Sequence, residues 1–202
     1  MKDFFTVSVL KPKSTYTRIF ANPHKVGISS LLLFVLGICY TFTVIVGYKN
    51  GFGAVVTPML NIPPEKYYFY EAFFGIPVFF MIAVVFGGVT RLLSVIFKGE
   101  GSFENNFSVY CTSSIIPTLI TMWLPETLLI VFFPDMRAQP LGGFEVLPIW
   151  ADAVRQIAGV VWPMIVSIIG LSVSEKISYW KSTLISVIAF VICAGIMVII
   201  IR

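Results

Sequence analysis

Long apolar runs separated by short polar loops dominate the chain, and four of them are uninterrupted. Each is close to the roughly 20 mainly apolar residues that an α-helix needs to cross the hydrocarbon core of a bilayer. Backbone groups in lipid must be paired within a helix or a closed barrel, and the runs lack the alternating polar positions of barrel strands. We therefore predict transmembrane helices at Val26 to Tyr48, Ala72 to Val89, Val154 to Val173 and Thr183 to Ile201.

The stretch from Phe97 to Phe133 predicts a fifth, interrupted span. A polar turn with two glycines leads into an apolar segment that Pro117 and Pro125 break. The segment forms either a single kinked span or two half-helices that enter and leave the membrane on the same side. Residues 107–133 make about 40 Å of helix, which tilt can fit into a core of about 30 Å. Half-helices of about a dozen residues would reach only half way and would need a protein-lined cavity, so length favours the single span.

The first 25 residues predict an interfacial helix ahead of the first span. Tyr16, Ile19 and Phe20 share one helical face between Ser14, a candidate N-cap, and Ala21, and basic residues surround them. Such a helix suits a surface of anionic headgroups, and a solvated tail with chance periodicity is the alternative. The apolar run that follows is too long for a cleavable signal peptide.

These segments predict an all-α polytopic membrane bundle of five transmembrane helices with an N-terminal interfacial helix. The composition agrees, because 57% hydrophobic residues, 12% charged residues and a mean hydropathy of +0.92 are far from the values of soluble domains. The expected division is a cytoplasmic N-terminal segment at 1–25 and a membrane domain at 26–202, with spans near 26–48, 72–97, 107–133, 154–173 and 181–201.

Lysine and arginine are concentrated before the first span, which predicts a cytoplasmic N-terminus. Five of the fourteen lie there: Lys2, Lys11, Lys13, Arg18 and Lys25. Five spans place nine basic residues inside and five outside, with the C-terminus outside. The half-helix threading places ten inside and four outside, so charge does not discriminate between the two. The membrane flank accounts for the net charge of +4, and we expect no nucleic-acid partner.

Glu126 is the one carboxylate that we expect at bilayer depth, and its depth depends on where the broken span begins. A span that begins at Phe107 places Glu126 about 28 Å along, near the far headgroups and in the first turn of a helix restarted after Pro125. A span that begins at Ile115 places it about 16 Å in, close to the midplane, where an ionisable group is a candidate for a proton- or ion-linked role. The interfacial, structural interpretation is favoured.

No motif for catalysis or for a cofactor accompanies these spans. His24 has no Cys, Asp or Glu at ligand spacing, and Cys39, Cys111 and Cys193 fall in or near different apolar runs without a CxxC pair. We therefore expect no metal, no cofactor and no enzymatic activity.

The sequence KGEGS predicts a tight connection between the second and third spans. Gly99 and Gly101 suit a tight turn, and Ser102 can cap the helix that follows. Arg91 lies near the end of the second span, from which its guanidinium can extend to the headgroups.

Three stretches resemble the Yip-domain membrane proteins, the Ypt/Rab-interacting group and its prokaryotic relatives. They are VLKPKSTYTRIFANPHK before the first span, KGEGSFENNFSVY with Tyr110 entering the third, and GLSVSEKISYWKS after the fourth. The resemblance covers nearly the whole chain and implies five spans, a cytoplasmic N-terminus and no catalytic motif. Pro117 departs from the family pattern, in which a proline is expected nearer to Tyr110.

The resemblance also bears on location and partners. Eukaryotic members use an acidic, aromatic-rich N-terminal extension that this sequence does not show, so we do not expect binding to a Rab-type GTPase. A brief N-terminal segment is typical of a prokaryotic member in the cytoplasmic membrane, and the ER or Golgi membrane of a eukaryote is the alternative.

Two functions follow from these features. The first is a non-enzymatic protein that organises membranes or scaffolds partners through helix and lipid contacts, with the lipid bilayer and a second copy or another membrane protein as partners. The second is a small permease or ion-coupled carrier built around Glu126, Tyr110, Thr112, Ser113 and Ser114. The residues singled out for a functional role are Glu126, Tyr110 and Pro117.

A topology reporter fused to the C-terminus distinguishes the two threadings of the broken span. Five spans with a cytoplasmic N-terminus place the reporter outside, where an enzyme that folds only in the periplasm or lumen becomes active. Activity of a reporter that functions only in the cytoplasm would instead favour the pair of half-helices.

Overall fold

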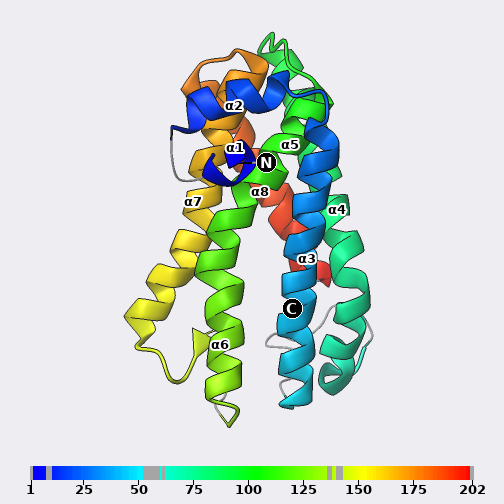
Figure 1. Ribbon diagram of the computed structural model, residues 1–202, viewed down its shortest axis with the longest axis vertical. Helices are drawn as coiled ribbons and strands as arrows, with labels where there is room; N and C mark the ends of the chain where they lie inside the picture. Colours follow the sequence, from blue (N-terminus) through cyan, green and yellow to red (C-terminus); the bar gives the residue numbers. More distant parts are fainter. Residues whose placement is uncertain are drawn as a thin grey trace.

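Five long helices form the body of the protein, which we describe from a computed structural model (Figure 1). The structure describes residues 2–7, 11–51, 60, 62–135, 138–139 and 143–200. Each of the five is long and apolar enough to cross a membrane: α3 (Lys25–Lys49), α4 (Pro64–Ile96), the third helix (Phe103–Phe132), α7 (Ile149–Glu175) and α8 (Tyr179–Ile200). The predicted all-α bundle with five spans is confirmed. Ile201, the predicted end of the last span, lies outside the described residues. So do Arg137 and Arg202, two of the five basic residues that the five-span prediction places on the outer side.

The third helix is continuous through both prolines. It consists of α5 (Phe103–Thr118), a π-helical turn η1 (Leu119–Trp123) and α6 (Leu124–Phe132). The prediction of a single span is therefore confirmed, and no half-helices meet at either proline. Ser102 caps α5 as predicted, because its Oγ accepts a hydrogen bond from the backbone N–H of Asn105 at 3.3 Å.

Helix α4 begins earlier than the apolar run that predicted it. The sequence predicts a span from Ala72, whereas the helix begins at Pro64, which occupies its first turn. Glu71 consequently lies inside the helix and is fully buried. The charge of Glu71 ended the apolar run in the sequence but did not end the helix.

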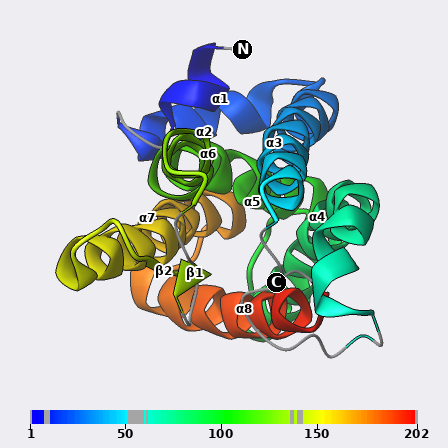
Figure 2. The same cartoon turned by 90° about the horizontal axis from the view of Figure 1, so that it is seen from below.

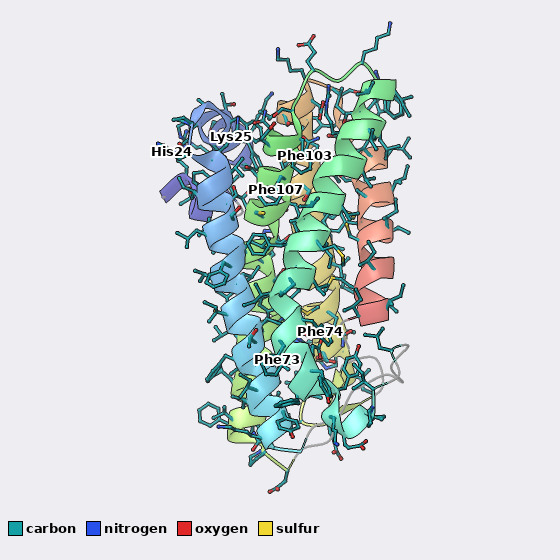
Figure 3. The ribbon with its side chains drawn as sticks, turned by 90° about the vertical axis from the view of Figure 1, so that its right-hand side faces the viewer. His24, Lys25, Phe73, Phe74, Phe103 and Phe107 are labelled. Carbon is teal, nitrogen blue, oxygen red and sulfur yellow. The ribbon has the colours of Figure 1, made fainter. Side chains whose placement is uncertain are left out.

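The other helices pack around α5, and α8 lies at one side of the bundle. Figure 2 shows α8 between α4 and α7, with α5 near the centre of the bundle, where it contacts α3, α4 and α7. Figure 3 shows His24 and Lys25 at the same end as Phe103 and Phe107, with Phe73 and Phe74 toward the other end. A short antiparallel pair, β1 (Ala138–Gln139) and β2 (Gly143–Phe144), lies in the connection between α6 and α7.

The outer surface of the bundle is apolar. Large side chains such as Phe73, Leu92 and Val191 are 66–72% exposed on α4 and α8. A soluble monomer rarely exposes contiguous apolar surface on this scale, whereas lipid tails cover it without cost.

The N-terminal segment folds onto one end of the bundle. Helix α1 (Lys2–Thr6) is followed by α2 (Pro12–Ala21), which lies across the upper end in Figure 1. The predicted N-cap Ser14 is wrong: Lys11 occupies the cap position with a left-handed φ of 45°, Pro12 follows it, and the Oγ of Ser14 donates to the carbonyl of Lys11. Proline favours the first helical position because its fixed φ suits a helix and its missing N–H would be unpaired there.

Tyr16 anchors α2 to the bundle. Its ring is fully buried, and its Oη lies 3.5 Å from the carbonyl oxygen of Val109 and 3.3 Å from Oγ1 of Thr112. Burial raises the pKa of the Tyr16 phenol, so the group stays protonated and can donate a hydrogen bond. A Cβ added at Gly170 would lie 2.7 Å from Cζ of Tyr16, so glycine on α7 makes room for the ring. The apolar face of α2 therefore packs on protein, which leaves the basic residues Lys13 and Arg18 exposed.

Replacing Gly170 with alanine is expected to loosen this anchor. Overpacking of this kind costs about 1–3 kcal/mol, so Gly170→Ala should lower the melting temperature in detergent. Gly195→Ala is the matched control, because a Cβ added at Gly195 meets no atom within 4 Å. Equal melting temperatures for the two variants would contradict the role of Gly170.

Candidate functional site

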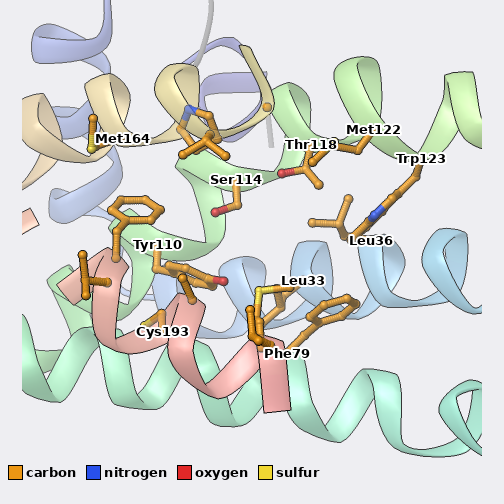
Figure 4. A pocket seen from close by; sticks show the side chains of 18 of the residues that line it. Leu33, Leu36, Phe79, Tyr110, Ser114, Thr118, Met122, Trp123, Met164 and Cys193 are labelled. Atoms are coloured by element: carbon orange, nitrogen blue, oxygen red, sulfur yellow. The ribbon is translucent and has the colours of Figure 1, made fainter. Parts of the chain in front are cut away.

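An apolar cavity of about 470 Å³ lies among the five long helices (Figure 4). Ligand sites in proteins commonly have volumes of roughly 300–1,000 Å³. Three hydroxyl groups interrupt its apolar lining, those of Tyr110, Ser114 and Thr118. These residues are four apart on α5, so they form one polar line along a single helical face.

The cavity opens sideways between α7 and α8. Val160 on α7 and Val191 and Val198 on α8 line it and are 52–66% exposed. Phe79 and Trp123, which also line it, are at most 8% exposed and form the inner wall. The mouth therefore belongs to the apolar outer surface, and the closed side belongs to the core.

Tyr110 is the most unusual group in the lining. Its side chain is only 8% exposed, and its ring packs on that of Phe86 at a centroid distance of 5.1 Å. Figure 4 shows its hydroxyl end directed along the cavity, toward the side where Leu33 and Phe79 lie. Among the described residues, none forms a hydrogen bond with this hydroxyl, which faces the open space of the cavity.

The two prolines of the third helix flank the π-helical turn, whose Met122 and Trp123 line the cavity. Pro125 has no N–H, so the carbonyl of Thr121 has no donor four residues further along the helix. Nη1 of Arg155 supplies one at 3.1 Å. Pro117, singled out from the sequence, lies in the buried wall beside the cavity, where its carbonyl accepts from Oγ1 of Thr121 at 2.6 Å.

Helix α7 approaches this turn closely at a glycine. A Cβ added at Gly159 would lie 2.9 Å from Oγ1 of Thr121 and 3.1 Å from Met122. The π-helical turn and α7 therefore form one packed wall of the cavity. Single π-helical turns occur frequently at functional sites.

Glu126 lies outside the cavity and is bound by Arg155. Nη1 of Arg155 lies 3.0 Å from Oε1 of Glu126, and Nε lies 2.8 Å from Oδ1 of Asp152. The guanidinium also lies over the ring of Phe144, with its Cζ 5.5 Å from the ring centroid. The predicted placement in a first turn agrees with the structure, because Glu126 follows Pro125 at the beginning of α6.

The length of the third helix bears on the depth of Glu126. The helix Phe103–Phe132 has its centre near Pro117, and Glu126 lies about 13 Å beyond that point at 1.5 Å per residue. The hydrocarbon core extends about 15 Å from its midplane. A centred helix therefore places Glu126 close to the headgroups, which favours the interfacial interpretation.

Glu71 is a buried carboxylate that sequence reasoning missed. It is fully buried on α4 and accepts a hydrogen bond from Oη of Tyr40, whose ring packs on Phe79 and Trp123. The periodicity of α4 could have revealed it, since Tyr67, four residues earlier, and Gly75, four residues later, are also buried.

Glu175 is the second buried carboxylate that sequence reasoning missed, and it joins three helices. Its Oε2 accepts from Nη1 of Arg91 at 2.8 Å and from the N–H of Gly101 at 2.9 Å, and its Oε1 accepts from Nδ2 of Asn106 at 2.6 Å. Oγ of Ser174 donates to Oδ1 of Asn106 at 2.7 Å.

The prediction that Arg91 extends to the headgroups is wrong, because its guanidinium binds the Glu175 carboxylate and the carbonyl of Gly99. We call Glu175, Arg91, Asn106 and Gly101 the Glu175 cluster.

The glycines of the turn before α5 are explained by the Glu175 carboxylate. A Cβ added at Gly99 would lie 2.6 Å from Oε2 of Glu175, and one at Gly101 would lie 2.7 Å from its Cδ. Lys176 and Glu100 pair above the cluster at 2.8 Å, which lowers the pKa of the Glu100 carboxyl and raises that of the Lys176 ammonium. The turn before α5 and the end of α7 are therefore one unit.

The residues assigned to a carrier do not converge on one site. Tyr110 and Ser114 line the cavity, whereas Thr112 contacts Tyr16 and Oγ of Ser113 lies 2.8 Å from Oγ of Ser167. Glu126 belongs to the separate pair with Arg155.

The chemistry available in the cavity is that of binding. Its lining contains no charged residue, and no described group of three His, Cys, Asp or Glu residues could hold a metal ion. Apolar walls and hydroxyl donors suit a neutral apolar molecule that carries a hydrogen-bond acceptor.

One comparison with known proteins gives a match. The family model described as the Yip1 domain matches residues 7–201, nearly the whole chain. Comparison with curated proteins and with solved structures gives no match.

Removing the carboxylate of Glu175 is expected to destabilise the bundle strongly. Glu175→Ala leaves Arg91 and Asn106 without their shared acceptor, and loss of one partner from a buried ion pair costs about 3–5 kcal/mol. Because Arg91 is 31% exposed, we expect a loss near the lower end, about 3 kcal/mol, measured by thermal or denaturant unfolding in detergent. Glu100→Ala, which removes an exposed partner of Lys176, is the control and should change stability little. Similar losses for both variants would contradict the central place of Glu175.

Proposed function

Because the chain belongs to the Yip1-domain family, we propose that it is a non-enzymatic integral membrane protein that organises its membrane through lipid and helix contacts. The observation that carries this proposal is the cavity between α7 and α8, whose lining is uncharged and whose mouth is part of the apolar outer surface. A surface of this kind suits contact with neighbouring hydrocarbon or helices.

The ion pairs and hydrogen bonds of three carboxylates support the same function. Glu175 and Glu126 are bound by arginines, and Glu71 accepts a hydrogen bond from Tyr40. Carboxylates held in this way stabilise helix packing. General acid–base catalysis most often uses His, Glu, Asp or Lys within reach of a substrate, and the cavity lining contains none of these.

The distribution of basic residues supports a cytoplasmic N-terminus. The end of the bundle that carries α2 holds Lys11, Lys13, Arg18, Lys25, Arg91, Lys98, Lys176 and Lys181. The described residues of the opposite end include Lys49, Lys66 and Arg155. The positive-inside rule then favours a cytoplasmic N-terminus and an outer C-terminus. The location that we propose is the cytoplasmic membrane of a prokaryote. Partners on the lipid-facing surface are the bilayer and a second copy or another membrane protein.

A carrier that uses Glu126 has weaker support. A coupling carboxylate must exchange its partner during transport, and it usually faces a substrate site near the midplane. Glu126 is bound by Arg155 and is not part of the cavity lining.

A complementation experiment separates the two functions. The gene is deleted in its host, and membrane order is measured with a polarity-sensitive fluorescent lipid probe. We expect deletion to change the probe signal and Glu126→Gln to restore it as fully as the wild type, because Arg155 remains paired with Asp152. Gly195→Ala serves as a second folded control.

Two results would count against the proposal. An unchanged probe signal on deletion would remove the organising function. A well-folded Glu126→Gln protein that fails to restore the signal would favour the carrier.

A further inference from the structure

We infer that the cavity between α7 and α8 binds one chain of an acyl lipid, with the ester carbonyl of that chain accepting a hydrogen bond from Oη of Tyr110. This inference rests on the proposed function in lipid contact and names the ligand of its central site. The shape of the cavity, its opening to the bilayer, its lack of charge and the unpaired hydroxyl of Tyr110 each support the inference independently.

The cavity has the length of a lipid chain. Its lining extends along α8 from Val187 to Val198, and along the third helix from Tyr110 to Trp123. At 1.5 Å per residue these stretches are about 16 Å and about 20 Å long. One leaflet of the hydrocarbon core is about 15 Å thick, so an extended chain fits along the cavity.

The volume favours a chain over a helix. A helix with a diameter of about 10 Å and a length of about 16 Å fills roughly 1,250 Å³. The cavity holds about 470 Å³. A helix of a second copy can therefore cover the mouth but is too large to fill the interior.

The depth of the cavity in the bilayer indicates what fills it. The lining residue Pro163 lies near the middle of α7 and Phe79 near the middle of α4, so the cavity crosses the central part of both spans. The mouth valines Val160 and Val191 are exposed at the same depth. Lipid chains are the solvent at this level, and an open apolar cavity in contact with them fills with hydrocarbon.

The hydroxyl of Tyr110 calls for a hydrogen-bond acceptor on the ligand. This hydroxyl faces the cavity without a protein partner, and a ligand that displaces water from the cavity must supply an acceptor or leave the hydroxyl unsatisfied. Ser114 and Thr118 can bond to carbonyls one turn earlier on their own helix. The phenol of Tyr110 is held away from its own backbone by the ring, so its acceptor must come from inside the cavity.

Charge selects the type of acceptor. The lining has no Lys, Arg or His, so no cation is present to hold a phosphate or carboxylate inside. A neutral carbonyl oxygen matches an O–H donor in an apolar site, and an ester-linked acyl chain carries one at the end of its hydrocarbon. The lipid headgroup remains outside the mouth.

Quenching of Trp123 by brominated lipid tests the proposal. Trp123 lies in the inner wall and is 8% exposed, whereas Trp162 lies near mid-depth on α7 and is only partly buried. Variants that keep only Trp123, or only Trp162, are made by changing the remaining tryptophans to phenylalanine. Both are reconstituted in phosphatidylcholine vesicles with increasing fractions of lipid brominated on its acyl chains. We expect quenching of Trp123 as well as of Trp162.

Substitutions in the cavity make the test specific. Ser114→Leu fills the interior and should abolish quenching of Trp123 while Trp162 remains quenched. Ala194→Phe, at the α8 side of the lining, is a second filling variant in case the first does not fold. In vesicles of an ether-linked phosphatidylcholine, which has no ester carbonyl, Tyr110→Phe should raise the fraction of brominated ester lipid needed for half-maximal quenching of Trp123 roughly fivefold, the loss of one hydrogen bond. Tyr70→Phe is the matched control, because Tyr70 is 45% exposed on α4 and lies outside the cavity.

Each other outcome overturns a defined part of the proposal. Quenching of Trp162 without Trp123 would show that no chain enters the cavity, although lipid contact survives. Quenching of neither would remove the lipid contact on which the proposed function rests. Equal half-maximal fractions for the Tyr110→Phe and Tyr70→Phe variants in the ether-linked vesicles would leave a chain in the cavity but overturn the carbonyl contact. Disulfide formation between two copies of a Val191→Cys variant, with Trp123 unquenched, would assign the mouth to a second copy.

Discussion

The buried carboxylate of Glu175 is the interaction on which the arrangement of the helices depends. It is fully buried at the end of α7, and Arg91 from α4, Asn106 from α5 and the N–H of Gly101 all point to it. An isolated carboxylate in such a site would be too costly to keep ionised, so all three donors have to be in place together. The positions of α4, α5 and α7 at this end are therefore set by one small group of atoms.

The two ends of the bundle are held by different polar contacts. At the end with the Glu175 cluster, the short turn between α7 and α8 and the covering helix α2 close the structure. Toward the other end, α7 and α8 are joined by no comparable polar contact among the described residues, and the cavity lies between them. Arg155 joins α7 to the third helix there, through Glu126 and the carbonyl of Thr121, whereas the space between α7 and α8 is left to apolar packing.

The spans were predictable from the sequence because about 20 consecutive apolar residues can pair their backbone groups within the segment in lipid only as a helix. Ser102 as a cap and a single third span followed from local patterns and from length. Glu71 was not predictable in the same way, because a charge ends an apolar run in the sequence whether or not the helix continues. Glu175 and Arg91 are far apart in sequence, so their pairing depends on the packing of α4 against α7. The resemblance to Yip-domain proteins drew attention to Tyr110, but the cavity that it faces is formed mainly by α7 and α8.

The π-helical turn at Leu119–Trp123 has a consequence for how this chain can be compared with its relatives. A π-helical turn holds one residue more than the α-helical turn that it replaces. A relative with one residue fewer between the two prolines would form a regular helix there, and every later position of α6 would rotate by about 100°. Glu126 would then leave the side that faces Arg155, and an alignment without a gap at this point would equate residues on different faces of the third span.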